Sequence, residues 1–218
     1  MLSLKKQSLI EFDSYLGSKG FNRHSDSFYG ERYDRPIPGG RFSLSINWHL
    51  RKPVLVLDPA SAGIRLDEVE HEVFRFEEPS ELISEHDVLQ RSTIAFRLAG
   101  NEVLNLLTNR YTISRESDCS AIAQKYIQNM FDKAERFWRK FASKEVIFDA
   151  LSGIPAKARD STRVEPFSSQ RAVTLAKILK GPEIAERLGD QLLERLPDSS
   201  KKLFAEWLER AAQAWSKS

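Results

Sequence analysis

The chain has 218 residues, of which 41% are hydrophobic and 29% charged, a composition typical of a folded globular protein and not of a disordered one. Its formal net charge of +2 gives no general positive field, so direct binding to nucleic acid is not expected. No apolar run approaches the roughly 18 residues that cross a bilayer, so no membrane association is predicted. The single cysteine, Cys119, and the absence of a signal-peptide pattern favour a cytoplasmic protein.

The N-terminal part of the chain contains predicted helices and strands in turn. The clearest strand covers 41–50, where Phe42, Leu44, Ile46 and Trp48 alternate with polar residues at a period of two. Prolines and paired glycines mark 32–40 as turn-rich, and 59–63 is predicted to be a loop. The remaining predicted strands are 21–29, 54–57, 68–76, 93–98 and 111–114, and the predicted helices are 2–16, 80–89 and 101–108.

The strongest helical signal runs from 118 to 141, where apolar residues recur at intervals of three and four and so form one stripe. Ser143 interrupts this period before a short predicted helix over 144–151. Three further helices are predicted, separated by glycine or proline, over 168–180, 182–196 and 198–215. The stripe of the long helix consists of Ile122, Tyr126, Met130, Ala134, Phe137, Trp138 and Phe141.

These elements predict an α+β fold, in which an antiparallel sheet of about four or five strands packs against the long helix. Residues 1–155 form the predicted α+β domain, and 156–167 form a polar linker. The last three helices make up a small C-terminal helical extension over 168–218, which we expect to dock on the first domain or on a partner.

Three parts of this pattern together resemble the bacterial family known as domain of unknown function 4304. They are the end of the first helix at 16–21 with the strand at 27–29, the strand at 42–48, and the long helix through 137–141 into 143–151. The resemblance covers about residues 1–155, and the C-terminal helices resemble a tail that many members carry. It implies an immunity protein or another toxin-neighbourhood protein, and it assigns no catalytic residue. The chain departs from the family pattern in its longer segment at 59–85.

The segment 58–87 contains about ten acidic residues against two arginines, a local charge of about −8. An anionic face of this kind fits a cationic partner, such as a basic nuclease-type toxin domain. The alternatives for this segment are a solvated surface without a partner and a metal site. The predicted partner-binding residues are Asp67, Glu68, Glu70, Glu72, Glu77 and Glu78.

The histidines do not have the spacing of metal ligands, since the position four residues after His71 is Arg75 and not a second histidine. No nucleophile or phosphate-binding motif occurs either, so neither a catalytic residue nor a cofactor nor a metal is assigned. Cys119 is expected to be a packing residue. The cations near the aromatic residues of the long helix are expected to form its solvated back.

We therefore expect a non-enzymatic toxin-immunity protein, similar to an antitoxin, that neutralises a cognate bacterial toxin by occluding it. One alternative is a metal-dependent hydrolase that uses His49, His71 and nearby carboxylates. The other alternative is an adaptor or scaffold protein with a helical docking surface.

Overall fold

A computed structural model describes residues 3–27, 30–51, 53–77, 92–98, 111–153 and 168–217. Its contacts divide the chain into two compact units, each made from separated segments. The first unit comprises Met1–Ile64 and Ala95–Arg139, and the second comprises Arg65–Ile94 and Lys140–Ser218.

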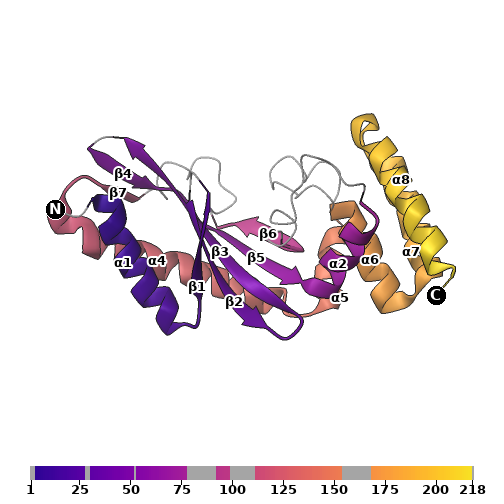
Figure 1. The fold of residues 1–218 in the computed structure, drawn as a ribbon, viewed down its shortest axis with the longest axis horizontal. Helices are drawn as coiled ribbons and strands as arrows, with labels where there is room; N and C mark the ends of the chain where they lie inside the picture. The colour runs from indigo at the N-terminus through magenta and orange to yellow at the C-terminus, as the bar shows by residue number, and fades with distance from the viewer. Residues whose placement is uncertain are drawn as a thin grey trace. The chain divides into compact units, whose positions relative to one another are not determined.

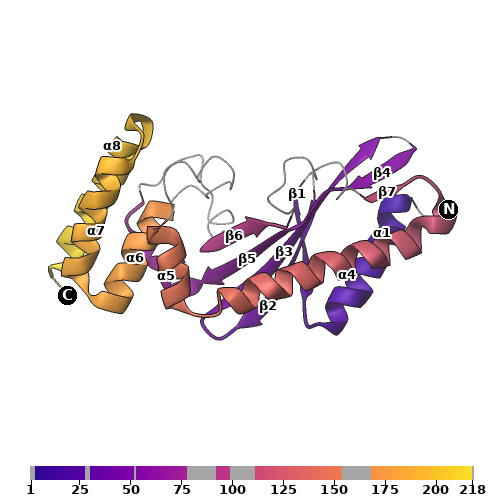
Figure 2. The same ribbon diagram turned by 180° about the vertical axis from the view of Figure 1, so that it is seen from behind.

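The first unit is built on an antiparallel sheet, drawn in Figures 1 and 2. Five strands lie in the order β1-β2-β3-β4-β7, and two more join through β3, which pairs with β5, and β5, which pairs with β6. The fold is α+β, as the sequence predicts. The strands are β1 (Asn22–Ser27), β2 (Gly30–Ile37), β3 (Gly40–Arg51), β4 (Val54–Leu57), β5 (Ser61–Leu66), β6 (Ile94–Arg97) and β7 (Tyr111–Ile113).

Helices α1 (Leu4–Ser18) and α4 (Glu116–Lys140) cover one face of this sheet (Figures 1 and 2). The two helices meet where the rings of Phe12 and Tyr126 lie 5.7 Å apart, and α4 meets β3 where Trp138 stacks on Phe42 at 5.3 Å. Trp138 also donates a hydrogen bond to the carbonyl of Gly63 at 3.0 Å, which satisfies its indole nitrogen in the core. Five of the seven residues predicted for the apolar stripe of the long helix are buried, Tyr126, Met130, Ala134, Phe137 and Trp138, whereas Ile122 and Phe141 are only partly buried.

Two predicted loops of this unit are strands. The turn-rich stretch 32–40 belongs largely to β2, and the predicted loop 59–63 enters β5 at Ser61. Pro36 is tolerated within β2 because β1 pairs only with Gly30–Asp34, so no strand on that side requires a hydrogen bond from Pro36, which has no N–H to donate. Gly30 is required for a different reason: an added Cβ would lie 2.3 Å from the carbonyl oxygen of Ile46.

The second unit is helical. It contains α2 (Asp67–Arg75), α5 (Lys144–Ser152), α6 (Ser168–Lys180), α7 (Pro182–Arg195) and α8 (Asp198–Trp215). The last four agree closely with the predicted helices, and Ser143 caps α5 by accepting a hydrogen bond from the amide of Val146. Eight consecutive residues of α6, from Ser169 to Ala176, are buried, so this helix is surrounded on all sides.

The predicted strand over 68–76 is wrong, because these residues form α2. Val69 and Val73 are both fully buried, and their spacing of four places them on one face of a helix. Val69, His71 and Val73 also alternate with polar residues as the buried face of a strand would. In the structure His71 is exposed, which agrees with the helix and not with that strand. Packing against the C-terminal helices decides between the two patterns, since the indole of Trp207 donates to the carbonyl of Val73 at 2.8 Å.

The two compact units also differ from the predicted domains, of which the first ended at residue 155. Helices α2 and α5 group with α6, α7 and α8 and not with the sheet. The predicted linker 156–167 and the predicted helices 80–89 and 101–108 lie outside the described residues. Within the described helices, none combines the length and the apolar character that a bilayer crossing needs.

Candidate functional site

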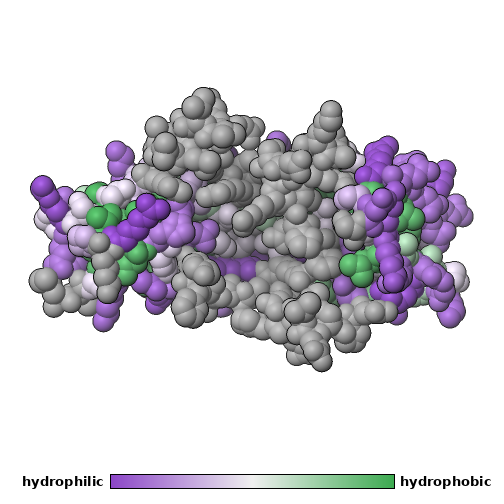
Figure 3. All heavy atoms as spheres, turned by 90° about the horizontal axis from the view of Figure 1, so that it is seen from above, coloured by the Kyte–Doolittle hydropathy of each residue, from purple (hydrophilic) through white to green (hydrophobic). Residues whose placement is uncertain are grey.

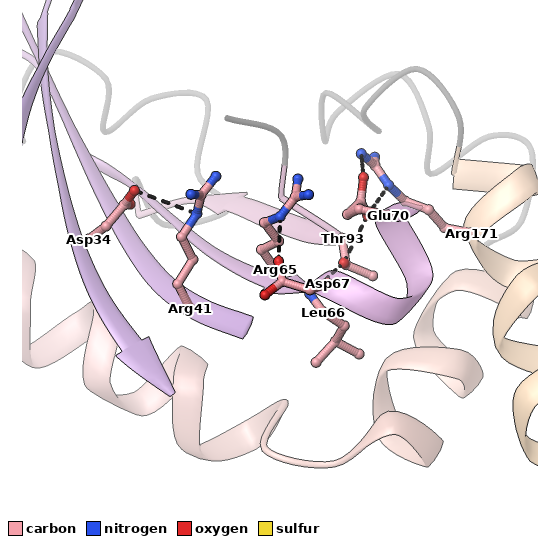
Figure 4. A network of polar contacts seen from close by, with 8 residues as sticks. All are labelled: Asp34, Arg41, Arg65, Leu66, Asp67, Glu70, Thr93 and Arg171. Atoms are coloured by element: carbon pink, nitrogen blue, oxygen red, sulfur yellow. Dashed lines mark hydrogen bonds and ion pairs between the residues drawn. The ribbon is translucent and has the colours of Figure 1, made fainter. Parts of the chain in front are cut away.

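Glu70, a predicted partner-binding residue, lies at the centre of the second unit. Its side chain and that of Arg171 both have an exposed fraction of 0%. Arg171 Nε and Nη2 donate to the two carboxylate oxygens of Glu70 at 2.8 Å each, a bidentate pair shown in Figure 4. Thr93 donates to Glu70 at 2.8 Å and accepts from the amide of Leu66 at 2.9 Å. Glu70 therefore joins α2 to α6 internally, which corrects its assignment to an exposed anionic face.

Glu72 is also held by contacts within the second unit, one of them with a residue near the C-terminus. It accepts hydrogen bonds from Trp215 Nε1 at 2.7 Å and from Lys177 Nζ at 3.3 Å. Partial burial alone would raise the pKa of Glu72, but these two hydrogen bonds and the charges of Lys177 and Arg75 outweigh it and lower the pKa. The carboxylate is thus charged and largely used within the protein.

The other predicted residues of α2 lie nearer the surface. Asp67 keeps 47% of its side chain exposed while it accepts from Arg65 Nε at 2.7 Å, and Glu68 keeps 45% exposed while it pairs with Lys144. Glu77 is half-buried just beyond α2, and Glu78 lies outside the described residues. Each acidic residue of α2 therefore has a cationic neighbour within its own unit.

Helix α7 carries a second group of carboxylates, which the sequence analysis did not single out. Glu183, Glu186, Asp190 and Glu194 are all exposed, and none of them forms an ion pair or hydrogen bond with another described side chain. Seen from above, the described atoms over α7 and α8 are mostly hydrophilic (Figure 3). The spacing of Glu186, Asp190 and Glu194, four residues apart each time, was the signal that could have identified them.

Close packing on α8 fixes which face of α7 remains exposed. Ala185, Gly189 and Leu192 are its buried residues, and they share the opposite side of the helix from the carboxylates. A Cβ added at Gly189 would lie 2.7 Å from the methyl groups of Leu208, so glycine permits this close approach. The acidic stripe consequently points away from the core of its unit.

The described histidines lie on different elements: His24 on β1, His49 on β3 and His71 on α2. His49 on β3 lies with its Nε2 2.5 Å from Asp58 Oδ2, and the exposed fractions are 50% for the imidazole and 5% for the carboxylate. The backbone of Asp58 is fixed on both sides, since its amide donates to Asn47 and its carbonyl accepts from Tyr126. His71 belongs to α2 in the other compact unit. Across the described segments, no three side chains suited to a metal gather together.

Two further polar features of the described part have structural partners. Cys119 is fully buried with its Sγ 3.4 Å from Ser8 Oγ, which confirms its packing role between α4 and α1. On β2 and β3, Arg32 Nε approaches Asp34 at 2.8 Å and Arg41 Nε approaches it at 3.5 Å (Figure 4 shows the latter pair).

Comparison of the chain with protein-family models, curated proteins and solved structures gives no match. The resemblance to domain of unknown function 4304 therefore stays an interpretation of the residue pattern.

Proposed function

We propose that the chain is a non-enzymatic binding protein of the toxin-immunity type, which acts in the cytoplasm and occludes a cationic partner. The observation that carries this proposal is the set of exposed carboxylates on α7: Glu183, Glu186, Asp190 and Glu194. The family resemblance supports the same class of function. The partner that fits is a basic protein toxin, such as a nuclease-type domain, whose positive surface would face these carboxylates.

Repulsion among the carboxylates on α7 lowers the stability of this helix when no partner is bound. Like charges four residues apart destabilise a helix by about 0.2–0.5 kcal/mol per pair, and Glu186, Asp190 and Glu194 form two such pairs. The exposed Arg187 lies four residues after Glu183 and three before Asp190, so its charge offsets part of this repulsion. A cationic surface would relieve this repulsion on binding. It would also speed the encounter, because complementary fields steer association at low salt. The acidic stripe therefore lowers the stability of the free protein slightly, and binding to a cationic partner would recover that loss.

The predicted residues of α2 have a smaller part in this proposal. Asp67 and Glu68 remain about half exposed, and their ion pairs are of the surface kind that contribute about 0–1 kcal/mol, so a partner's cations can replace them. Glu77 is half-buried and Glu78 lies outside the described residues, so the proposal does not rest on either of them. Glu70 is excluded by its complete burial, and Glu72 is occupied by Trp215 and Lys177.

Co-expression with the product of the neighbouring gene tests the proposal, with affinity measured by calorimetry at low salt. The triple variant Glu186→Lys, Asp190→Lys and Glu194→Lys is expected to weaken binding at least tenfold. A control variant with the same change in net charge, Glu116→Lys, Asp118→Lys and Glu209→Lys, reverses exposed residues outside α7 and is expected to bind as the parent does. If both variants bind equally well, the α7 surface is wrong. If no neighbouring product binds, the immunity assignment is wrong.

A second candidate function, a hydrolase, is favoured by the His49–Asp58 contact. A buried carboxylate that accepts from Nε2 fixes the imidazole tautomer and leaves Nδ1 of a half-exposed ring as a base. Hydrolysis of activated esters and phosphodiesters by the purified protein, with and without added divalent metal, is the test. Activity lost in His49→Gln and kept in His24→Gln would support it. The absence of turnover, or turnover that survives His49→Gln, would remove it.

A further inference from the structure

We draw no further inference here: the strongest candidate, the Arg32–Asp34–Arg41 side-chain cluster on β2 and β3, has further contacts of its own, and nothing in the described part of the structure shows a ligand that it would hold.

Discussion

Helices α2 and α7 belong to the same compact unit, and each carries four acidic residues. In α2, the carboxylates of Asp67, Glu68, Glu70 and Glu72 each contact a lysine or an arginine. In α7, the four carboxylates are exposed and contact no cation among the described residues. Local acidity is therefore a poor guide to an anionic surface. Arg65 is a near neighbour of Asp67, but Lys144, Arg171 and Lys177 come from far along the chain, and Arg171 lies 101 residues from Glu70.

The largest expected effect comes from removing the cation of the buried pair. Arg171→Met leaves the carboxylate of Glu70 buried without its partner, so the free energy of unfolding should fall by about 3–5 kcal/mol. Urea denaturation with a two-state fit measures this change. The double variant Glu70→Leu with Arg171→Met removes both charges and is the matched control, since it should lose less than the single variant. A single variant within about 1 kcal/mol of the parent would show that the pair tolerates the loss of one charge.

A smaller effect is expected at Trp215, whose indole donates to Glu72. Trp215→Phe keeps an aromatic ring beside Trp207 and Phe76 but loses that hydrogen bond to a charged group, and it should cost about 1–2 kcal/mol at pH 7. Thermal or urea unfolding of both proteins at a series of pH values measures the difference.

The pH dependence of that difference follows from the lowered pKa of Glu72. A carboxyl group whose folded pKa lies below its ordinary value of 4.5 stabilises the fold above that value and loses this contribution as the pH falls through the folded pKa. The gap between the parent and Trp215→Phe should therefore be largest near neutral pH and shrink below pH 4.5. Glu72→Gln serves as the control, because in that background the effect of Trp215→Phe should not change with pH. A gap that widens in acid would contradict the hydrogen bond to a charged Glu72.

The smallest expected effect has the opposite sign and lies on α7. Asp190→Lys replaces two repulsive pairs, with Glu186 and Glu194, by two attractive ones, and it turns the attractive pair with Arg187 into a repulsive one. The free energy of unfolding should therefore rise by about 0.4–1 kcal/mol. The matched change on α2, Glu68→Lys, replaces the pair with Lys144 by a repulsion and should lower stability slightly. Urea unfolding at low salt measures the free energy of unfolding of both variants and shows which one gains and which one loses stability. A clear loss of stability in Asp190→Lys would mean that this carboxylate has a structural partner.

Much of the fold could be predicted because helix signals are local. The glycine and proline at 181–182 and the proline at 197 separate α6, α7 and α8 at the predicted places, and the apolar stripe identifies the buried face of α4. Prediction failed where one pattern fits two structures, as at 68–76, or where a proline lies in a strand beyond the reach of one neighbouring strand, as Pro36 lies beyond β1. In both places the secondary structure depends on residues that are close in space but not in sequence, and a local sequence pattern carries no information about them.

The same limit of local sequence patterns applies to the prediction of the candidate site. The sequence by itself determined which residues carry charge, where α5, α6, α7 and α8 begin and end, and that α7 places its carboxylates on one face. Only the tertiary structure decided that Glu70 is buried against Arg171 while Asp190 remains exposed to solvent. The physical reason is that the energy of a charge depends on its distance to other charges and to water, and folding sets these distances between residues a hundred positions apart.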